Sequence, residues 1–338
     1  MDSLQQLIDE SHELSQDSPR PHMGCSLLGH PCDRWLWLNF RWAVIEQFPG
    51  RIKRLFRRGQ LEEKTVVDDL NAIGMVIKST GADQSRVSFG CHVSGSVDGV
   101  IESGVPGSAQ KKQKHILEIK THSLKSFDDL AKNGVKQSKL MHWVQMQLYM
   151  LGSGIDRALY VAVCKNDDRI HSEVVEFDSA AANKALERGK RITTSDRMPE
   201  PISADPSWYL CKFCPGHDLC HGSKTTKEVN CRTCAHSTAK PDGTWRCERF
   251  EADDIPIEWQ RKGCESHVIH PDVVPWQIKE GRNKWTAVYM IDGKAVANGE
   301  ADATVFSSKE ILANPLACAH GDAFVQSIRT DFDGEIIG

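Results

Sequence analysis

Residues 95–101 read Gly-Ser-Val-Asp-Gly-Val-Ile, and residues 116–120 read Ile-Leu-Glu-Ile-Lys. Both are apolar segments of strand length that contain charged residues. Because side chains alternate between the two faces of a strand, Glu118 and Lys120 project together while Ile119 points to the core. Asp98 lies near the end of the preceding strand and can add a second carboxylate at the same edge. The pattern predicts charged groups gathered on a nearly buried strand.

Two converging carboxylates form a hard oxygen site that suits Mg²⁺ or Mn²⁺. Such an ion can activate water and neutralise charge on a phosphodiester, and a nearby lysine can position the nucleophile or the phosphate. The alternative is a solvent-exposed Glu–Lys pair on an edge strand, because isolated Glu-Ile-Lys triplets are frequent by chance.

Helical segments on either side of these strands carry further polar groups. Upstream, Glu62 and Glu63 lie on a helix from which an acidic side chain can reach the same metal. Downstream, His142, Gln145 and Tyr149 are spaced i, i+3 and i+7, so they share one helical face. A core helix would carry aliphatic residues there, and a solvated polar face is the alternative interpretation.

In this order the pieces resemble the PD-(D/E)XK nuclease superfamily, in particular its RecB-like exonuclease branch, which includes the CRISPR-associated exonucleases. The resemblance covers roughly residues 25–222. It implies that Asp98 and Glu118 bind Mg²⁺ or Mn²⁺ and that Lys120 assists the attacking water. Glu62 and Glu63 both fit the helical acid and are both candidate catalytic residues, with Glu62 carried as the third metal ligand. The residues implied in substrate binding are Gln145, Tyr149 and, on the same face, His142.

The resemblance also implies a fold and an activity. The fold is a restriction-endonuclease-like α/β core, with a mixed central sheet flanked by helices, appended cysteine-rich metal modules and a small β-containing tail. The activity is a metal-dependent DNA exonuclease of phage type, which processes linear ends for recombination or repair with a single-strand annealing or recombination protein as partner. The alternatives are a structure-specific or restriction-type endonuclease on the same core, and a non-cleaving DNA-binding or assembly factor.

Three cysteines form a C-x2-C-x5-C pattern after the nuclease-like motifs, and Cys32 is the natural fourth ligand, with Cys25 as an alternative. One cysteine before the motifs and three after them is similar to the arrangement that holds a [4Fe–4S] cluster in CRISPR-associated and AddB-like nucleases, and such a cluster takes four thiolates. Zinc with His217 or His221 as fourth ligand is the competing interpretation. The expected cluster ligands are Cys32, Cys211, Cys214 and Cys220.

A second cysteine set follows directly. A C-x2-C knuckle with two later cysteines is typical of a four-thiolate zinc site. The segment is too short to bury a core of its own, so a metal would contribute its folding free energy directly. The locally basic residues Arg232, Arg246, Arg249 and 260–262 favour DNA contact weakly, and a partner-binding or capping role is left open. The expected zinc ligands are Cys231, Cys234, Cys247 and Cys264.

Composition limits the setting without identifying a partner. The chain has 338 residues, a net charge of −4 and 40% hydrophobic residues, with no apolar run long enough to cross a bilayer. The polar start lacks the pattern of a secretory signal, so we expect a cytoplasmic protein. Twelve cysteines in a reducing compartment favour metal ligands over disulfides. Any DNA binding must come from local patches.

Two such patches flank the predicted metal site. Residues 41–64 contain seven basic and three acidic residues, and residues 111–139 contain eight lysines and three acidic residues. Both suit a phosphate backbone, although ordinary solvated faces are the alternative. Trp35, Trp37 and Phe40 can stack on unpaired bases, but tryptophans at this spacing more often pack in a core.

The predicted elements place these motifs in four regions. We expect helices in 25–75, at 137–151 and at 179–193, strands in 86–120 and at about 157–164 and 170–177, a hairpin at 291–294 and a helix near 307–313. The expected divisions are a helical lead-in 1–24, a nuclease domain 25–222, a zinc-type module 223–270 and a β-containing unit 271–338.

Overall fold

The structure is a computed structural model that describes residues 3–14, 18–108, 112–222, 224–281 and 283–337. The chain forms two compact units, the first made of Met1–His30 and Gln47–Arg191, the second of Pro31–Glu46 and Ile192–Gly338. The divisions expected from the sequence are after residues 24, 222 and 270. The two units instead group Pro31–Glu46 with the C-terminal half of the chain. Parts of the expected lead-in (1–2 and 15–17) and of the lysine stretch (109–111) lie outside the described residues.

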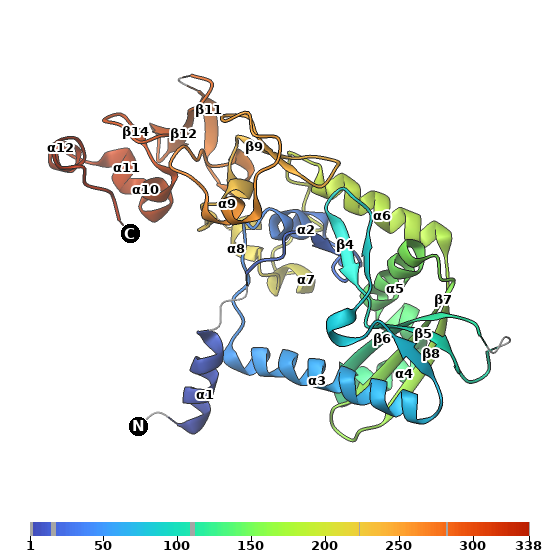
Figure 1. The fold of residues 1–338 in the computed structure, drawn as a ribbon. Coiled ribbons are helices and arrows are strands. Elements are labelled where there is room, and N and C mark those ends of the chain that lie inside the picture. Colours follow the sequence, from blue (N-terminus) through green and yellow to red (C-terminus); the bar gives the residue numbers. More distant parts are fainter. Residues whose placement is uncertain (1–2, 15–17, 109–111, 223, 282, 338) are drawn as a thin grey trace. The chain divides into compact units, whose positions relative to one another are not determined.

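The first unit is built on a five-stranded mixed sheet of order β2-β5-β6-β7-β8 (Figure 1). Strands β6 and β7 pair in parallel, and the other neighbouring pairs are antiparallel. The sequence predicted β7 and β8 to within a residue. The strand bounds are Val76–Lys78 for β2, Gly99–Ser103 for β5, His115–His122 for β6, Arg157–Cys164 for β7 and Ile170–Glu176 for β8.

The helices of the first unit carry several of the predicted site residues, and those at 50–72, 124–138 and 140–153 contact this sheet. The predicted helix from 137 begins at Leu140, because Lys139 before it is not helical. The helix that precedes it is kinked at Gly134, which has a φ of 74°. The predicted helix 179–193 is confirmed. The helices are α1 (Leu4–Glu13), α3 (Gly50–Ala72), α4 (Leu124–Ser138), α5 (Leu140–Ser153) and α6 (Ser179–Thr193).

The core of the first unit lies on the odd-numbered face of β6. Leu117 and Ile119 are fully buried there, against Val66 of α3 and neighbouring strand residues such as Val161. The even-numbered residues of β6 therefore face the other side, under α5. The alternation that predicted Ile119 in the core is confirmed.

A second, three-stranded sheet of order β1-β4-β3 lies beside α5. Its bounds are Met23–Gly24 for β1, Arg86–Ser88 for β3 and Val93–Ser96 for β4, with a 3₁₀ turn η1 at Gly81–Asp83. Gly95 of β4 lies directly against α5, because a Cβ at this position would be 2.8 Å from Cε1 of Tyr149. The glycine is needed for this close approach.

The second unit begins with α2 (Asp33–Phe40) and continues after α6 with short elements around the cysteines. The three aromatic residues Trp35, Trp37 and Phe40 are buried here, which confirms the favoured interpretation that they pack in a core and do not stack on bases. The cysteine-rich elements are α7 (Tyr209–Lys212), α8 (His217–Cys220), η2 (Cys231–Thr233), β9 (Ser237–Ala239), β10 (Trp245–Cys247), α9 (Ile257–Lys262) and η3 (Pro271–Val273).

The C-terminal part of this unit is a four-stranded sheet of order β11-β12-β13-β14 followed by three helices. The predicted hairpin is confirmed, with Asp292 and Gly293 both at positive φ, and the predicted helix near 307 is confirmed with Ser307 as its N-cap. Among the described residues, no helix is long and apolar enough to span a membrane. The bounds are Gln277–Glu280 for β11, Ala287–Ile291 for β12, Lys294–Asn298 for β13, Val305–Phe306 for β14, Ser308–Ala313 for α10, Pro315–His320 for α11 and Ala323–Phe332 for α12.

Candidate active site

Three charged residues meet beside the central strand of the large sheet. Glu118 and Lys120 lie on β6, and Asp98 lies just before β5. The β5–β6 ladder begins at Gly99, which lies opposite Leu117, so Asp98 lies one residue before the ladder. Its Oδ2 accepts a 2.9 Å hydrogen bond from the amide of Ile119 and lies 3.7 Å from Nζ of Lys120. Lys120 also forms an ion pair with Glu118, whose side chain is fully buried. The sequence pattern placed these side chains on one edge, and the structure brings them together.

A fourth charged group comes from α3. The carboxylate of Glu63 interacts electrostatically with Asp98, Glu118 and Lys120. Glu62 is the next residue on the same helix, where one residue corresponds to a rotation of about 100°. The structure therefore links Glu63 to Asp98, Glu118 and Lys120. We call these four residues the acidic cluster.

Lys120 contacts the carboxylates of Asp98 and Glu118 and interacts electrostatically with that of Glu63, and the pKa values of these groups reflect this. Burial raises the pKa of Glu118 to about 8, against the lowering effect of Lys120. Burial and then the charge of Asp98 raise the pKa of Glu63 to about 7. Burial acts to lower the pKa of Lys120, but the carboxylates outweigh it and raise the pKa above its ordinary value. Excess negative charge held out of water is a condition that a cation would relieve.

The polar face of α5 is buried against this cluster and is not solvated. Gln145 is only 5% exposed, and its Nε2 donates hydrogen bonds to Oε2 of Glu118 at 3.2 Å and to the hydroxyl of Tyr149 at 3.0 Å. Tyr149 is 3% exposed and rests on Gly95. The structure thus places Gln145 and Tyr149 behind Glu118, where they orient its carboxylate.

His142 takes part in a different network. Its Nδ1 lies 2.8 Å from the hydroxyl of Tyr160 on β7, and Nε2 of His122 on β6 lies 2.9 Å from the same hydroxyl. Burial lowers the pKa of His142 to about 3 and that of His122 to about 4, so both rings are neutral at pH 7. Sequence reasoning missed His122, although it lies two residues beyond Lys120 on the same strand face.

The carboxylates fit a hard divalent ion by their chemistry. Oε1 of Glu118 is buried with the ammonium of Lys120 as its ion-pair partner, and three carboxylates outnumber the one lysine. Across the described ranges, however, no group of three or more His, Cys, Asp or Glu side chains is arranged so that it could hold a metal ion. Since Lys120 contacts both Asp98 and Glu118, a cation between the carboxylates requires the ammonium to move aside.

The first cysteine set lies within the second unit. The thiol of Cys214 interacts electrostatically with those of Cys32, Cys220 and Cys211. Arg34 donates a 3.5 Å hydrogen bond to Sγ of Cys220. Cys25, the alternative fourth ligand, belongs to the first unit, where it is buried beside Gly95. The structure therefore groups Cys32, and not Cys25, with the three later cysteines.

The second cysteine set also converges. Cys231, Cys234, Cys247 and Cys264 all line one small cavity in the second unit. Burial, followed by the neighbouring thiols, raises the pKa of Cys231 to about 12. Three of the remaining cysteines are small buried residues of the core, namely Cys25, Cys164 and Cys318.

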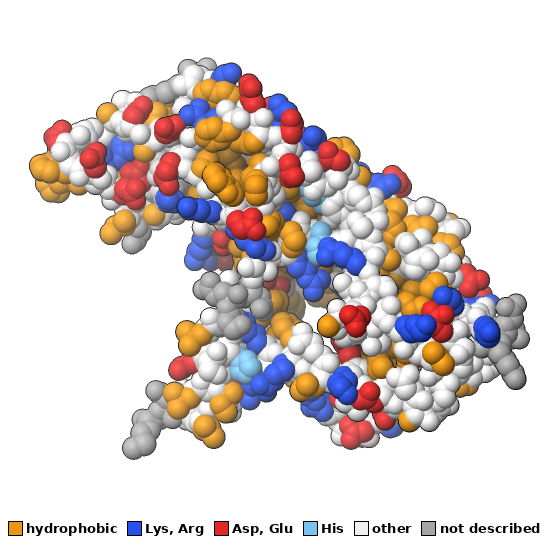
Figure 2. Space-filling model, in the orientation of Figure 1, with side chains coloured by type: hydrophobic (Ala, Val, Ile, Leu, Met, Phe, Trp, Pro, Cys, Tyr) orange, Lys and Arg blue, Asp and Glu red, His pale blue; other side chains and the backbone are white. Residues whose placement is uncertain are grey.

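Basic side chains occur along α3 before Glu63. Arg51, Arg57 and Arg58 are exposed, whereas Arg54 pairs with Asp9 of α1 at 3.0 Å. Figure 2 shows Lys and Arg side chains along the segment that Figure 1 labels α3. This surface leads towards the acidic cluster along the helix.

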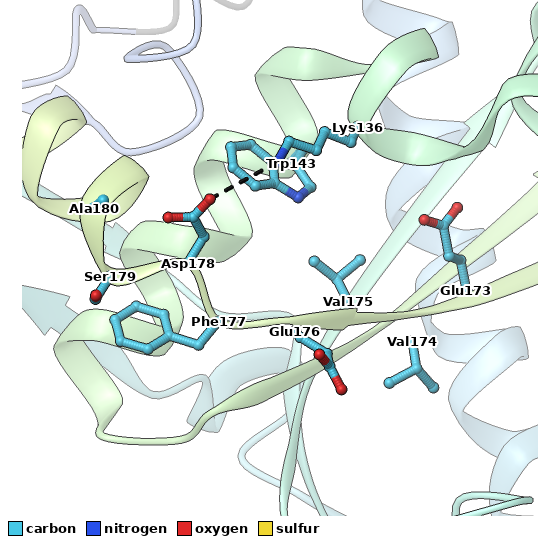
Figure 3. Close-up of a pocket in the computed structure, with 10 residues that line it drawn as sticks. All are labelled: Lys136, Trp143, Glu173, Val174, Val175, Glu176, Phe177, Asp178, Ser179 and Ala180. Carbon is cyan, nitrogen blue, oxygen red and sulfur yellow. Dashed lines mark ion pairs between the residues drawn. The ribbon is translucent and has the colours of Figure 1, made fainter.

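A larger cavity in the first unit lies elsewhere. It has a volume of about 550 Å³ and is lined by α4, α5, β8 and the start of α6 (Figure 3). Nζ of Lys136 lies 4.4 Å from the ring centre of Trp143 and 3.8 Å from the carboxylate of Asp178. Asp98, Glu118 and Lys120 are not among the described residues that line it. This cavity therefore adds nothing to the acidic cluster.

Comparisons with known proteins give only distant likenesses. No family model and no curated protein matches the chain. Among solved structures, the protein SSO0001 is 15% identical, with a TM-score of 0.37 over 65% of this chain and 96% of that one. An alkaline exonuclease from Laribacter hongkongensis is 15% identical, with a TM-score of 0.35 over 55% and 90%. A phage-related exonuclease from Haemophilus somnus 129PT is 18% identical, with a TM-score of 0.29 over 40% and 66%. At these values the likenesses assign no function to this chain.

Proposed function

We propose that the chain is a Mg²⁺- or Mn²⁺-dependent deoxyribonuclease that shortens linear DNA from its ends. The observation that carries the proposal is the convergence of Asp98 and Glu118 on Lys120 at the central strand of the large sheet, with Glu63 close enough to interact electrostatically with all three. A carboxylate cluster with one lysine, buried on one side and open at Lys120, suits phosphodiester hydrolysis. An exposed Glu–Lys pair would not have a fully buried glutamate.

In this proposal Asp98, Glu118 and Glu63 hold the divalent cation. The bound cation supplies a polarised water and offsets charge on the scissile phosphate. Lys120 keeps its ammonium form, since its pKa is raised, and its side chain is 28% exposed, so it can turn from the carboxylates towards a phosphate oxygen or the attacking water. Gln145 holds one oxygen of Glu118, and the other, Oε1, is paired with Lys120, so it becomes available to a ligand when the ammonium moves aside.

DNA as the substrate is supported by the positive charge along α3. The sequence contains no evident base-reading element, so we expect binding without sequence preference. The exposed arginines of α3 precede Glu63 by one to three helical turns, so a backbone along this helix passes the acidic cluster. Phosphate contacts of this kind are indifferent to sequence and weaken with salt. The recombination partner and the phage setting remain expectations from the family resemblance.

We also propose that Cys32, Cys211, Cys214 and Cys220 hold a [4Fe–4S] cluster as thiolates. The grouping of the four thiols supports this, as does the amide of Trp35, which donates to Sγ of Cys32 at 3.4 Å. Such a cluster would tie the start of α2 to the segment after α6. Its role in this proposal is structural.

The test is a nuclease assay with full-length protein purified without air. End-labelled linear duplex, single-stranded DNA and closed circular DNA are incubated with Mg²⁺ or Mn²⁺. We expect shortening of linear DNA that is abolished in Lys120→Ala. Lys114→Ala is the matched control, because Lys114 pairs with Glu102 at 3.0 Å on the same two strands, away from the cluster. Nicking of closed circles at an equal rate would favour an endonuclease, and no cleavage of any substrate would favour a non-cleaving DNA-binding factor.

A further inference from the structure

The second cysteine set is built around a cavity of ionic size. Its four cysteines come from three local segments, and all of them line the same cavity. The segments are η2 with the residue after it, β10 and the loop after α9. The cavity has a volume of about 20 Å³, which is room for one water-sized particle. The thiol of Cys231 interacts electrostatically with the other three. Four thiolates are typical ligands of a tetrahedral zinc ion.

The backbone around these thiols is already organised. Asn230 caps η2, accepting hydrogen bonds from the amides of Arg232 at 2.9 Å and Thr233 at 3.2 Å. The amide of His236 donates to Sγ of Cys234 at 3.5 Å. The β9–β10 ladder sets Cys247 opposite Ser237. Amide donors to sulfur favour the thiolate form, which is the form that binds metal.

Arg232, inside the Cys231–Cys234 knuckle, links the set to α2. Its side chain is 1% exposed, its Nε donates to Oε1 of Gln260 at 2.9 Å and its Nη1 donates to the carbonyl of Phe40 at 2.9 Å. The guanidinium lies 3.8 Å from the ring centre of Trp42. The knuckle thereby holds the C-terminal end of α2, which is far from it in sequence.

These contacts leave the module little charge for DNA. Arg232 is buried, Arg246 pairs with Glu248 at 2.8 Å, and Arg249 pairs with Glu300 at 2.6 Å. Three of the basic residues that favoured DNA contact in the sequence are therefore already occupied. A structural role for the module is the better interpretation.

We propose that Cys231, Cys234, Cys247 and Cys264 bind one Zn²⁺ as thiolates, and that this site holds Arg232 against the end of α2. Zinc would draw the four sulfurs to Zn–S distances of about 2.3 Å. Because Cys32 caps the other end of α2, this helix is held between the two cysteine sets. The zinc site itself is independent of the proposed nuclease activity, and only the statement about the first end of α2 rests on the proposed cluster.

Metal analysis of the full-length protein tests the site. Elemental analysis should find one zinc per chain in the wild type and none in Cys247→Ser, with the iron content unchanged. Cys318→Ser is the matched control, since Cys318 is buried away from both sets, and it should keep its zinc. Wild-type protein without zinc, zinc retained in Cys247→Ser, or iron lost in place of zinc would overturn the proposal. These readouts involve no DNA, so failure of the nuclease proposal would be seen separately.

Hydrogen exchange tests the role of Arg232. Amide protection over residues 33–40 should fall about tenfold or more when zinc is lost, because the end of α2 is released. Arg232→Met should keep the zinc and show a similar loss of protection. If Cys247→Ser fails to fold, removal of zinc from the wild type with a chelator gives the same comparison. Unchanged protection of α2 in the zinc-free protein would contradict the proposed link.

Discussion

Gln145 donates a 3.2 Å hydrogen bond from α5 to Oε2 of the buried Glu118 on β6. This single contact joins the helix face that the sequence marked as polar to the strand that it marked as charged. The glutamine side chain is almost completely buried, so the hydrogen bond is shielded from water. It fixes the orientation of Glu118 before any ligand binds.

Replacement of Gln145 by Met should therefore cost activity more than stability. The variant leaves one oxygen of Glu118 buried without its donor, a penalty of about 1–3 kcal/mol. DNA cleavage should fall about tenfold or more, because the carboxylate is no longer held in place. Cleavage rates and urea unfolding measure the two effects. Gln137→Met is the control at an exposed position of α4, and equal losses in both variants would argue against an orienting role.

The two adjacent glutamates of α3 should behave differently. Glu63 interacts with Asp98 and Lys120, so Glu63→Gln should reduce cleavage strongly, whereas Glu62→Gln should retain most of it. The paired variants change the same chemistry one residue apart. A strong loss in Glu62→Gln with normal activity in Glu63→Gln would reverse the assignment of the helical acid.

Glu63 also makes stability depend on pH in the metal-free protein. Its pKa is raised to about 7 in the folded state, so between about pH 4.5 and pH 7 the folded chain binds more protons than the unfolded chain. Stability from this group should fall as pH rises through that window, and Glu118, with a pKa of about 8, extends the fall upwards. Urea unfolding of wild type and Glu63→Gln at pH 5, 6, 7 and 8 checks the sign. A steeper fall in the variant would contradict it.

Gly95 should be intolerant of any side chain. A methyl group at this position would meet Cε1 of Tyr149 at 2.8 Å, so Gly95→Ala must displace Tyr149 and, through it, Gln145. We expect a loss of about 1–3 kcal/mol in unfolding free energy, together with reduced cleavage. Gly59→Ala is the control, because a methyl group added there on α3 would have no atom within 4 Å and alanine favours a helix. Equal stability of the two variants would argue against the close approach.

The colour of the protein tests whether Cys32 or Cys25 is the fourth ligand of the proposed cluster. Protein purified without air should be brown, with a broad visible absorption band from thiolate-bound iron and sulfide. Cys32→Ser should lose this band and its iron, while Cys25→Ser should keep both, since Cys25 lies beside Gly95 in the other unit. Colourless wild-type protein containing zinc alone would refute the cluster.

The strand alternation of β6 was enough to predict the side chains of Glu118, Lys120 and Ile119, because a period of two allows only one arrangement of faces. The acidic residue of α3 that faces the sheet was harder to predict. Glu62 and Glu63 differ by one residue, and only the packing of α3 on the sheet decides which of them turns inwards. The hydrogen bond between His122 and Tyr160 joins two strands, so no local pattern reveals it.

In the second unit, too, contacts between distant segments could not be predicted from local spacing. The pattern at Trp35, Trp37 and Phe40 left stacking on bases or packing in a core open, and the structure buries all three. Their partners, such as Arg232 and Trp245, come from distant segments. Sequence spacing found both cysteine sets. The grouping of residues 31–46 with the C-terminal half depends on long-range packing, which no local pattern shows.

The proposed function depends on the binding of a divalent cation by Asp98, Glu118 and Glu63. Electron paramagnetic resonance of Mn²⁺, titrated with full-length protein under anaerobic conditions, measures the free ion directly. We expect the free Mn²⁺ signal to fall with saturable binding in the wild type and to remain in Asp98→Asn, while Lys114→Ala binds like the wild type. Mn²⁺ binding that is absent from the wild type, or equal in Asp98→Asn, would contradict the account.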